Sequence, residues 1–194
     1  MFMRRPVWLT PAVLTIFMSG AAMMSVSMGS RQSQGLLIGP LSLDRDWPLA
    51  TFSLAVAVHN LMWGFFQPFT GAAADRWGAA RVAALGALAF GVGMIMTASG
   101  GALMTTIGLG VVSGFGLAAT SFSVVVGPVS RAVPPQHRTS AMGAAQALGS
   151  FGMMAMIPLS QWMIGAFGAT QTIWILSCFS LVSIPLALIL NKGE

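Results

Sequence analysis

Charged residues are scarce in this chain, and cysteine and lysine are almost absent. Only 7% of the 194 residues are Asp, Glu, Lys or Arg, whereas an average soluble domain carries roughly 25%. The chain therefore lacks the residues needed for an ordinary water-facing surface. Its one cysteine, Cys178, excludes a disulfide framework and a cysteine-based metal site. Its one lysine, Lys192, lies near the C-terminal end, so the sequence has no phosphate-binding loop of the kind that drives ATP-dependent transport.

Apolar residues make up 56% of the sequence and gather in long continuous runs. A membrane span needs about 20 such residues, and six spans would use nearly the whole chain. The runs lack the polar–apolar alternation of strands that line a barrel, which favours helices. We therefore predict an all-α membrane protein that forms a single domain over residues 1–194. Its six transmembrane helices are expected at about 8–30, 49–70, 80–98, 102–129, 140–167 and 172–190.

The breaks between runs fall where charge, proline and glycine cluster. A polar patch at residues 30–34 follows the first run, and residues 39–48 are predicted to form a loop. Residues 71–78 are predicted to form a short charged turn, and residues 131–139 are the most polar stretch. An alternative interpretation of the first run is a cleaved signal peptide, but the run continues well past the small residues near position 20.

The basic residues are unevenly divided between the two ends of the predicted bundle. The end opposite to the termini receives only Arg45, which lies between Asp44 and Asp46. The positive-inside rule therefore predicts cytoplasmic termini and a place in the cytoplasmic (inner) membrane. The arginines form no basic stripe on a polar face, which argues against a nucleic-acid partner. The end that carries the termini receives Arg4, Arg5, Arg76, Arg81, Arg131, Arg138 and Lys192.

The most specific motif lies between the second and third predicted spans, at residues 71–81. It reads Gly-Ala-Ala-Ala-Asp-Arg-Trp-Gly-Ala-Ala-Arg. Glycines permit a tight turn and close helix approach, and Asp75 is expected just before a helix start, where a carboxylate caps free amides. The motif resembles the G-x-x-x-D-R-x-G-x-x-R signature of the major facilitator superfamily. The positions that match the signature are Gly71, Asp75, Arg76, Gly78 and Arg81.

The resemblance implies one half of a major facilitator fold and a conformational lock at the five matching positions. In that family the matching aspartate and arginine steady the outward-open state, partly against a helix of a second six-span half. Such a half, either a second copy or a separate chain, is therefore an implied partner beside the lipid bilayer. Ala79 stands where the family often has a basic residue.

A weak internal repeat agrees with this fold. Residues 77–81 (Trp-Gly-Ala-Ala-Arg) resemble residues 167–171 (Phe-Gly-Ala-Thr-Gln). The first segment follows the second predicted span and the second follows the fifth, so the two lie on opposite sides of the membrane. An inverted three-plus-three repeat predicts this placement.

Other segments resemble the monocarboxylate-porter and oxalate/formate-exchanger branch of the superfamily. This branch implies a small organic anion, such as a monocarboxylate, as the substrate, and we expect no cofactor and no metal. The segments are residues 31–36 (Arg-Gln-Ser-Gln-Gly-Leu), 46–48 (Asp-Trp-Pro), 60–64 (Asn-Leu-Met-Trp-Gly), 67–68 (Gln-Pro) and 114–116 (Gly-Phe-Gly).

Arg31 is the residue most expected to bind substrate. A charge inside a membrane span costs several kcal/mol unless it faces water or a partner. At 1.5 Å per residue Arg31 would lie about 34 Å from Trp8, near the outer edge of a hydrocarbon core about 30 Å thick. A tilt or bend would bring it into an outward-opening cavity, where a guanidinium binds a carboxylate with two parallel hydrogen bonds. The alternative is an interfacial arginine that extends to the lipid headgroups.

Other polar residues within the predicted spans are further candidates. His59 could titrate and assist proton coupling, although such a histidine is more often a neutral group that hydrogen-bonds between helices. Gln146 and Ser150 are four residues apart and are expected to share the cavity of Arg31, and Gln67 could join them. The alternative role of these side chains is to join helices. The predicted substrate-binding residues are Arg31, Gln34, His59 and Gln146.

The predicted activity is secondary transport of a small organic anion by alternating access. The alternatives are a non-transporting membrane subunit and an inactive, truncated or split half of a transporter. A rhomboid-type intramembrane protease also has six spans, but Ser113 lies outside a G-x-S-G turn and no histidine follows His137. We therefore expect no enzyme activity.

Overall fold

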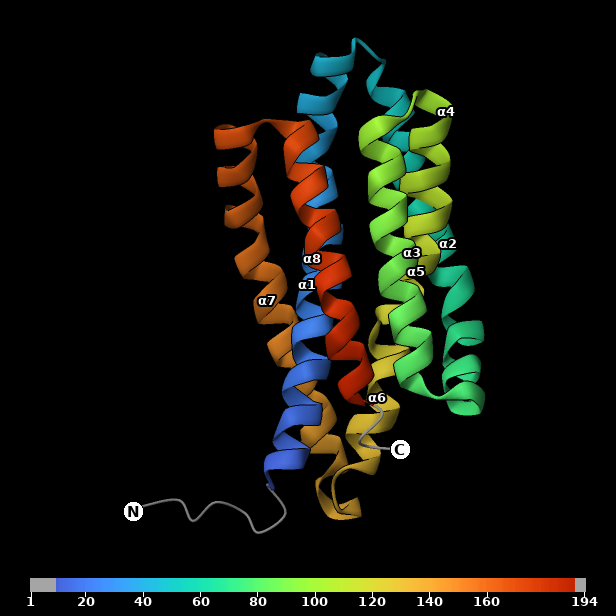
Figure 1. Cartoon of the computed structure of the whole chain (residues 1–194), viewed down its shortest axis with the longest axis vertical. Coiled ribbons are helices and arrows are strands. Elements are labelled where there is room, and N and C mark those ends of the chain that lie inside the picture. The colour runs from blue at the N-terminus through green and yellow to red at the C-terminus, as the bar shows by residue number, and fades with distance from the viewer. Residues whose placement is uncertain (1–9, 191–194) are drawn as a thin grey trace.

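Six long helical segments run up and down beside one another (Figure 1). The computed structural model describes residues 10–190, and within them no strand occurs. All six segments are long and apolar enough to cross a membrane. The predicted all-α, six-span class is therefore confirmed. Five of the spans are α1 (Pro11–Arg45), α2 (Leu49–Trp77), α3 (Ala79–Ser99), α7 (Arg138–Phe167) and α8 (Ala169–Ile189).

The fourth span is interrupted. It consists of α4 (Ala102–Thr105), the π-helical segment η1 (Thr106–Val112), α5 (Ser113–Thr120) and α6 (Phe122–Arg131). Its break is at Ser121, whose backbone is extended at φ −84° and ψ 179°. A short 3₁₀ turn, η2 (Pro135–His137), joins this span to α7. The sequence predicted one uninterrupted helix here, because its apolar run is continuous.

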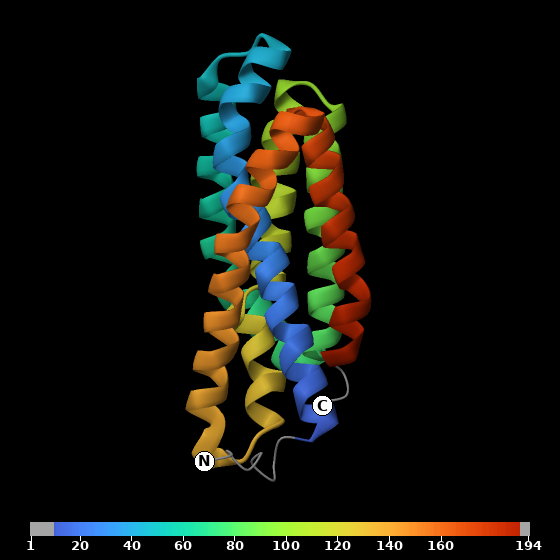
Figure 2. The same ribbon diagram turned by 90° about the vertical axis from the view of Figure 1, so that its left-hand side faces the viewer.

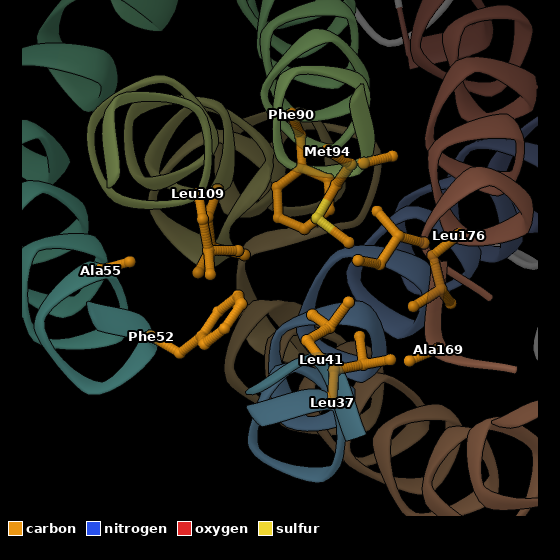
Figure 3. Packing of buried hydrophobic residues seen from close by; sticks show 12 residues of the cluster. Leu37, Leu41, Phe52, Ala55, Phe90, Met94, Leu109, Ala169 and Leu176 are labelled. Carbon is orange, nitrogen blue, oxygen red and sulfur yellow. The ribbon is translucent and has the colours of Figure 1, made fainter. Parts of the chain in front are cut away.

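The first span is much longer than the sequence predicted. α1 continues through the polar patch and through most of the predicted loop, and only residues 46–48 join it to α2. Leu37 and Leu41 are 3% and 2% exposed, and they pack against Phe52 and Leu176 in the main apolar cluster (Figure 3). The loop prediction was therefore wrong, because apolar packing keeps this segment helical up to Arg45.

Two tight turns show the inverted repeat in the backbone. Gly78 joins α2 to α3 and Gly168 joins α7 to α8, with φ values of 93° and 83°. Each glycine N–H donates to the carbonyl four residues earlier, that of Ala74 at 3.0 Å and that of Ile164 at 2.9 Å. α3 and α8 each contain 21 residues. The two turns lie at opposite ends of the bundle, as Figures 1 and 2 show. The weak sequence repeat therefore corresponds to a repeated structural unit.

Close packing, more than exclusion from water, holds these helices together, since lipid tails are as apolar as leucine. The approach of α3 to the fourth span is especially tight. A Cβ atom added to Gly116 would lie 2.4 Å from the backbone nitrogen of Phe90 and 2.7 Å from the carbonyl oxygen of Gly86. Backbone atoms cannot move aside as a flexible side chain can, so this crossing requires glycine.

Gly116→Ala is predicted to destabilise the bundle by about 1–3 kcal/mol, because overpacking forces the two helices apart. Gly143→Ala in α7 is the matched control, since an added Cβ there meets nothing within 4 Å. The measurement is the thermal unfolding midpoint of the purified protein in detergent. Equal midpoints for the two variants would contradict the packing argument.

Candidate functional site

A cavity of about 550 Å³ lies between α1, α2, α6 and α7. It contains four side chains that the sequence predicted to share a cavity: Arg31, Gln67, Gln146 and Ser150. The other lining residues are mostly apolar or small: Met24, Met28, Trp63, Ser121, Phe122, Ser123, Gly149 and Met153. A separate cavity of about 270 Å³ near Val13 has no charged lining residue, so it is less suited to a polar ligand.

Arg31 lies in the interior of α1, far from both of its ends. Because α1 continues to Arg45, Arg31 is about 30 Å from the first residue of the helix and about 21 Å from the last, at 1.5 Å per residue. The prediction that Arg31 lies near the outer edge of the hydrocarbon core assumed a helix that ends near residue 30, whereas α1 continues to Arg45; the depth of Arg31 in the membrane stays a prediction. A cation within a span needs partners inside the protein.

Neutral groups surround the guanidinium of Arg31. Its Nη1 atom donates to Oε1 of Gln32 at 2.8 Å, and its Nη2 atom donates to Oδ1 of Asn60 at 2.7 Å. The guanidinium carbon lies 4.6 Å from the ring centroid of Trp63, which is a cation–π contact. No ion pair to Arg31 occurs within residues 10–190. The positive charge therefore has no negative partner in this part of the chain.

The break in the fourth span adds a second electropositive feature to the cavity. α6 begins just after Ser121, and Phe122 and Ser123 in its first turn line the cavity. The first N–H groups of a helix have no intrahelical partner, and the helix dipole is positive there. Ser121 is 1% exposed, and its hydroxyl donates to the carbonyl of Ala118 at 2.8 Å. The sequence predicted no helix start here, although a serine before an apolar run is a known signal for one.

His59 lies in the helix interface and is not among the residues that line the 550 Å³ cavity. It is fully buried, and its Nδ1 atom lies 2.9 Å from the carbonyl oxygen of Leu109 and 3.0 Å from Oγ of Ser113. In η1 the N–H of Ser113 bonds to Gly108, which leaves the Leu109 carbonyl free for side chains. A carbonyl only accepts, so Nδ1 is the donor. This geometry is that of an interhelical hydrogen bond.

Gln34 lies in a smaller neighbouring cavity of about 150 Å³. Its side chain is 3% exposed, and neither amide atom has a hydrogen-bond partner within the described residues. Arg31 lines this cavity as well as the larger one. Gln34 and Gln146, both predicted to bind substrate, are thus in different cavities that share Arg31. The remaining lining residues of the smaller cavity are Gln32, Gly35, Val56 and Asn60.

The residues of the predicted lock lie where α2 meets α3. Gly71 is inside α2, and Gly78 makes the turn. Asp75 lies in the last turn of α2, so the prediction that it caps a helix start was wrong; no side chain caps α3. Asp75, Arg76 and Arg81 are exposed, and no ion pair joins them in the part of the chain that the structure describes.

Six membrane-spanning helices in two inverted units, with a half-buried cation in a cavity between them, are typical of a membrane-transporter architecture. Over residues 15–193 the chain matches the family model of the Major Facilitator Superfamily, and it belongs to that superfamily. It is therefore an integral membrane protein of the transporter class. A comparison with curated proteins finds no match.

His59→Leu is predicted to lower stability by about 0.5–1.5 kcal/mol, because it removes one of two donors to the buried carbonyl of Leu109, which still accepts from the hydroxyl of Ser113. Ser99→Ala is the control, since the hydroxyl of Ser99 is exposed and bonds only within α3. Thermal unfolding of both variants in detergent measures the difference. A midpoint for His59→Leu equal to that of the wild type would show that the hydrogen bond between α2 and η1 contributes nothing.

Proposed function

We propose that this protein transports a small organic anion by alternating access, with Arg31 as the group that binds the negative charge. The observation that carries the proposal is the guanidinium of Arg31, which lines a 550 Å³ cavity and has no acidic partner within residues 10–190. A cation in such a position stabilises an anionic ligand strongly, because the surroundings screen charge less than water does.

The cavity lining supports an anion that has an apolar body. The guanidinium and the α6 N-terminus both favour negative charge. Gln67, Gln146 and Ser150 offer hydrogen bonds, while Met24, Met153 and other apolar side chains cover most of the remaining wall. Arg31 is the one charged residue in this lining, which suits a ligand with a single negative charge. A monocarboxylate, the substrate class implied by the sequence resemblance, has this chemistry.

Two of the four spans that line the cavity, α2 and the fifth span, are also the least buried, which supports a second six-helix half as partner. Within the most apolar stretch of each span, 17% of α2 and 11% of the fifth span is buried inside the bundle. The corresponding share of the fourth span is 67%. α2 supplies Trp63 and Gln67 to the cavity, and α7 supplies Gln146 and Ser150. A second half, either another copy or a separate chain, would cover these helices and complete the cavity. It would also supply partners to Asp75 and the other lock residues.

The charge distribution supports a cytoplasmic location for the end of the bundle where α1 begins and α8 ends. The junctions α2–α3 and α6–α7 lie at this end (Figure 1) and carry Arg76, Arg81, Arg131 and Arg138. Arg45, at the other end, donates to the carbonyls of Ala98 at 2.6 Å and Gly100 at 3.0 Å. The positive-inside rule then favours cytoplasmic termini in an inner membrane. Arg4, Arg5 and Lys192, which the orientation prediction also used, lie outside the described residues.

Cysteine labelling tests this orientation. In a Cys178→Ser background, Gln136→Cys is predicted to react only with reagent that has entered the cytoplasm. Leu43→Cys, which replaces a side chain that is 85% exposed, is predicted to react with impermeant reagent outside the cell. The reverse pattern would invert the assignment.

Arg31→Ala is predicted to abolish uptake of radiolabelled monocarboxylates into proteoliposomes, and to weaken their binding more than tenfold, since hydrogen bonds to charged groups contribute about 1.5–3 kcal/mol. Arg31→Lys is predicted to retain partial binding, because lysine keeps the charge but loses the fork of donors. Arg138→Ala, at an exposed position, is the control.

Binding and uptake are measured on the same preparation. Binding that persists in Arg31→Ala would reject the assigned role of Arg31. Binding without uptake in the wild type would favour the non-transporting subunit over the transporter.

A further inference from the structure

Two amide oxygens accept hydrogen bonds from the two terminal nitrogens of Arg31, the groups that also bind carboxylates. Oε1 of Gln32 accepts from Nη1 at 2.8 Å, and Oδ1 of Asn60 accepts from Nη2 at 2.7 Å. Arginine binds carboxylates through the same pair of parallel N–H groups. Each terminal nitrogen of Arg31 therefore already donates to a neutral group of the protein, and an anion that binds both nitrogens from this side would displace these groups.

Asn60 is held in position for this role. Its Nδ2 atom donates to the carbonyl oxygen of Val56 at 2.9 Å, which fixes the side-chain amide with its oxygen toward Arg31. Gln32 belongs to α1 and Asn60 to α2. The guanidinium thus links two spans through hydrogen bonds that a stronger acceptor can replace.

The cavity beside these contacts contains an unsatisfied polar group. Gln34 lines the 150 Å³ cavity together with Arg31, Gln32 and Asn60. It is 3% exposed, and both of its amide atoms are buried without a hydrogen-bond partner within residues 10–190. A buried amide without a partner is destabilising. A polar occupant of the cavity that accepts from Nε2 of Gln34 would remove this cost.

We propose that the 150 Å³ cavity is a carboxylate subsite, in which a small carboxylate displaces the amide oxygens of Gln32 and Asn60 from Arg31 and accepts a further hydrogen bond from Gln34. The proposal rests on the proposed function, since it assumes that Arg31 binds an anion. The exchange is favourable because hydrogen bonds to an ionised acceptor are about twice as strong as those to a neutral one. It also releases the link between α1 and α2, so occupancy of the subsite changes how these two spans are joined.

Competition by the amide oxygens has a measurable consequence. Since the anion must displace them, removal of either oxygen should tighten binding. Asn60→Ala and Gln32→Ala are each predicted to raise the affinity for acetate about three- to tenfold, the range for one hydrogen bond. Asn60→Asp places a permanent carboxylate on the guanidinium and is predicted to weaken acetate binding more than tenfold. Gln34→Leu is predicted to weaken it about fivefold.

The experiment is a titration of the purified full-length protein with radiolabelled acetate at constant ionic strength. Gln161→Leu, at an exposed position of α7 outside both cavities, is the control for Gln34→Leu. Gln32 is exposed on α1, so Gln32→Ala tests the competition with little risk to folding. Monodisperse elution and an unchanged thermal midpoint verify that each variant is folded.

The outcomes separate this inference from the proposed function. Tighter binding in Asn60→Ala and Gln32→Ala, with weaker binding in Asn60→Asp and Gln34→Leu, supports the subsite. Unchanged or weaker binding in both alanine variants, with binding lost in Arg31→Ala, overturns the subsite and leaves the anion function in place. Absence of carboxylate binding by the wild type overturns both.

Discussion

A guanidinium within a membrane span must pair with another group, contact water or bind a ligand. The arrangement of this bundle depends on which of these partners Arg31 has. Four spans leave a cavity in front of it, and within residues 10–190 its partners are two neutral amide oxygens and the ring of Trp63. An acidic partner would have given a stable internal pair with no use for a ligand. Neutral partners accept from Nη1 and Nη2 without removing the charge, which leaves an anion as the strongest available partner.

The rest of the fold keeps this site in place by packing that does not rely on the hydrophobic effect. α3 approaches the fourth span most closely at Gly116, where a side chain would not fit. The hydroxyl of Ser180 in α8 donates to the carbonyl of Ala87 in α3 at 2.9 Å. The π-helical segment frees a carbonyl that His59 then binds from α2. In a bilayer such contacts replace the exclusion of water as the source of helix association. Two of the helices that line the cavity, α2 and α7, are the ones with most surface left uncovered.

Much of the architecture could be predicted because apolar run length and charge position are direct consequences of the membrane. The six spans and the repeated glycine turns follow from these patterns. The extent of α1 could not, because the polar patch and the charges near its end resemble a loop, while the buried positions of Leu37 and Leu41 depend on neighbours far away in sequence. Helix breaks inside continuous apolar runs, such as that at Ser121, are likewise set by tertiary packing.

For the candidate site, the sequence predicted which residue types would gather and missed how they would pair. The spacing of Gln146 and Ser150 and the charge of Arg31 within a predicted span indicated a shared cavity, which the structure contains. The pairing of Arg31 with Asn60 and the isolation of Gln34 depend on how α1 and α2 cross. A single sequence carries no signal for that crossing.

The most direct test of the central claim is a crystal structure of the protein soaked with a brominated monocarboxylate, with the bromine located by anomalous scattering. The account predicts the bromine in the 550 Å³ cavity and the carboxylate within hydrogen-bonding distance of the guanidinium of Arg31. A bromine bound elsewhere, with Arg31 still held by Gln32 and Asn60 at saturating ligand, would contradict it.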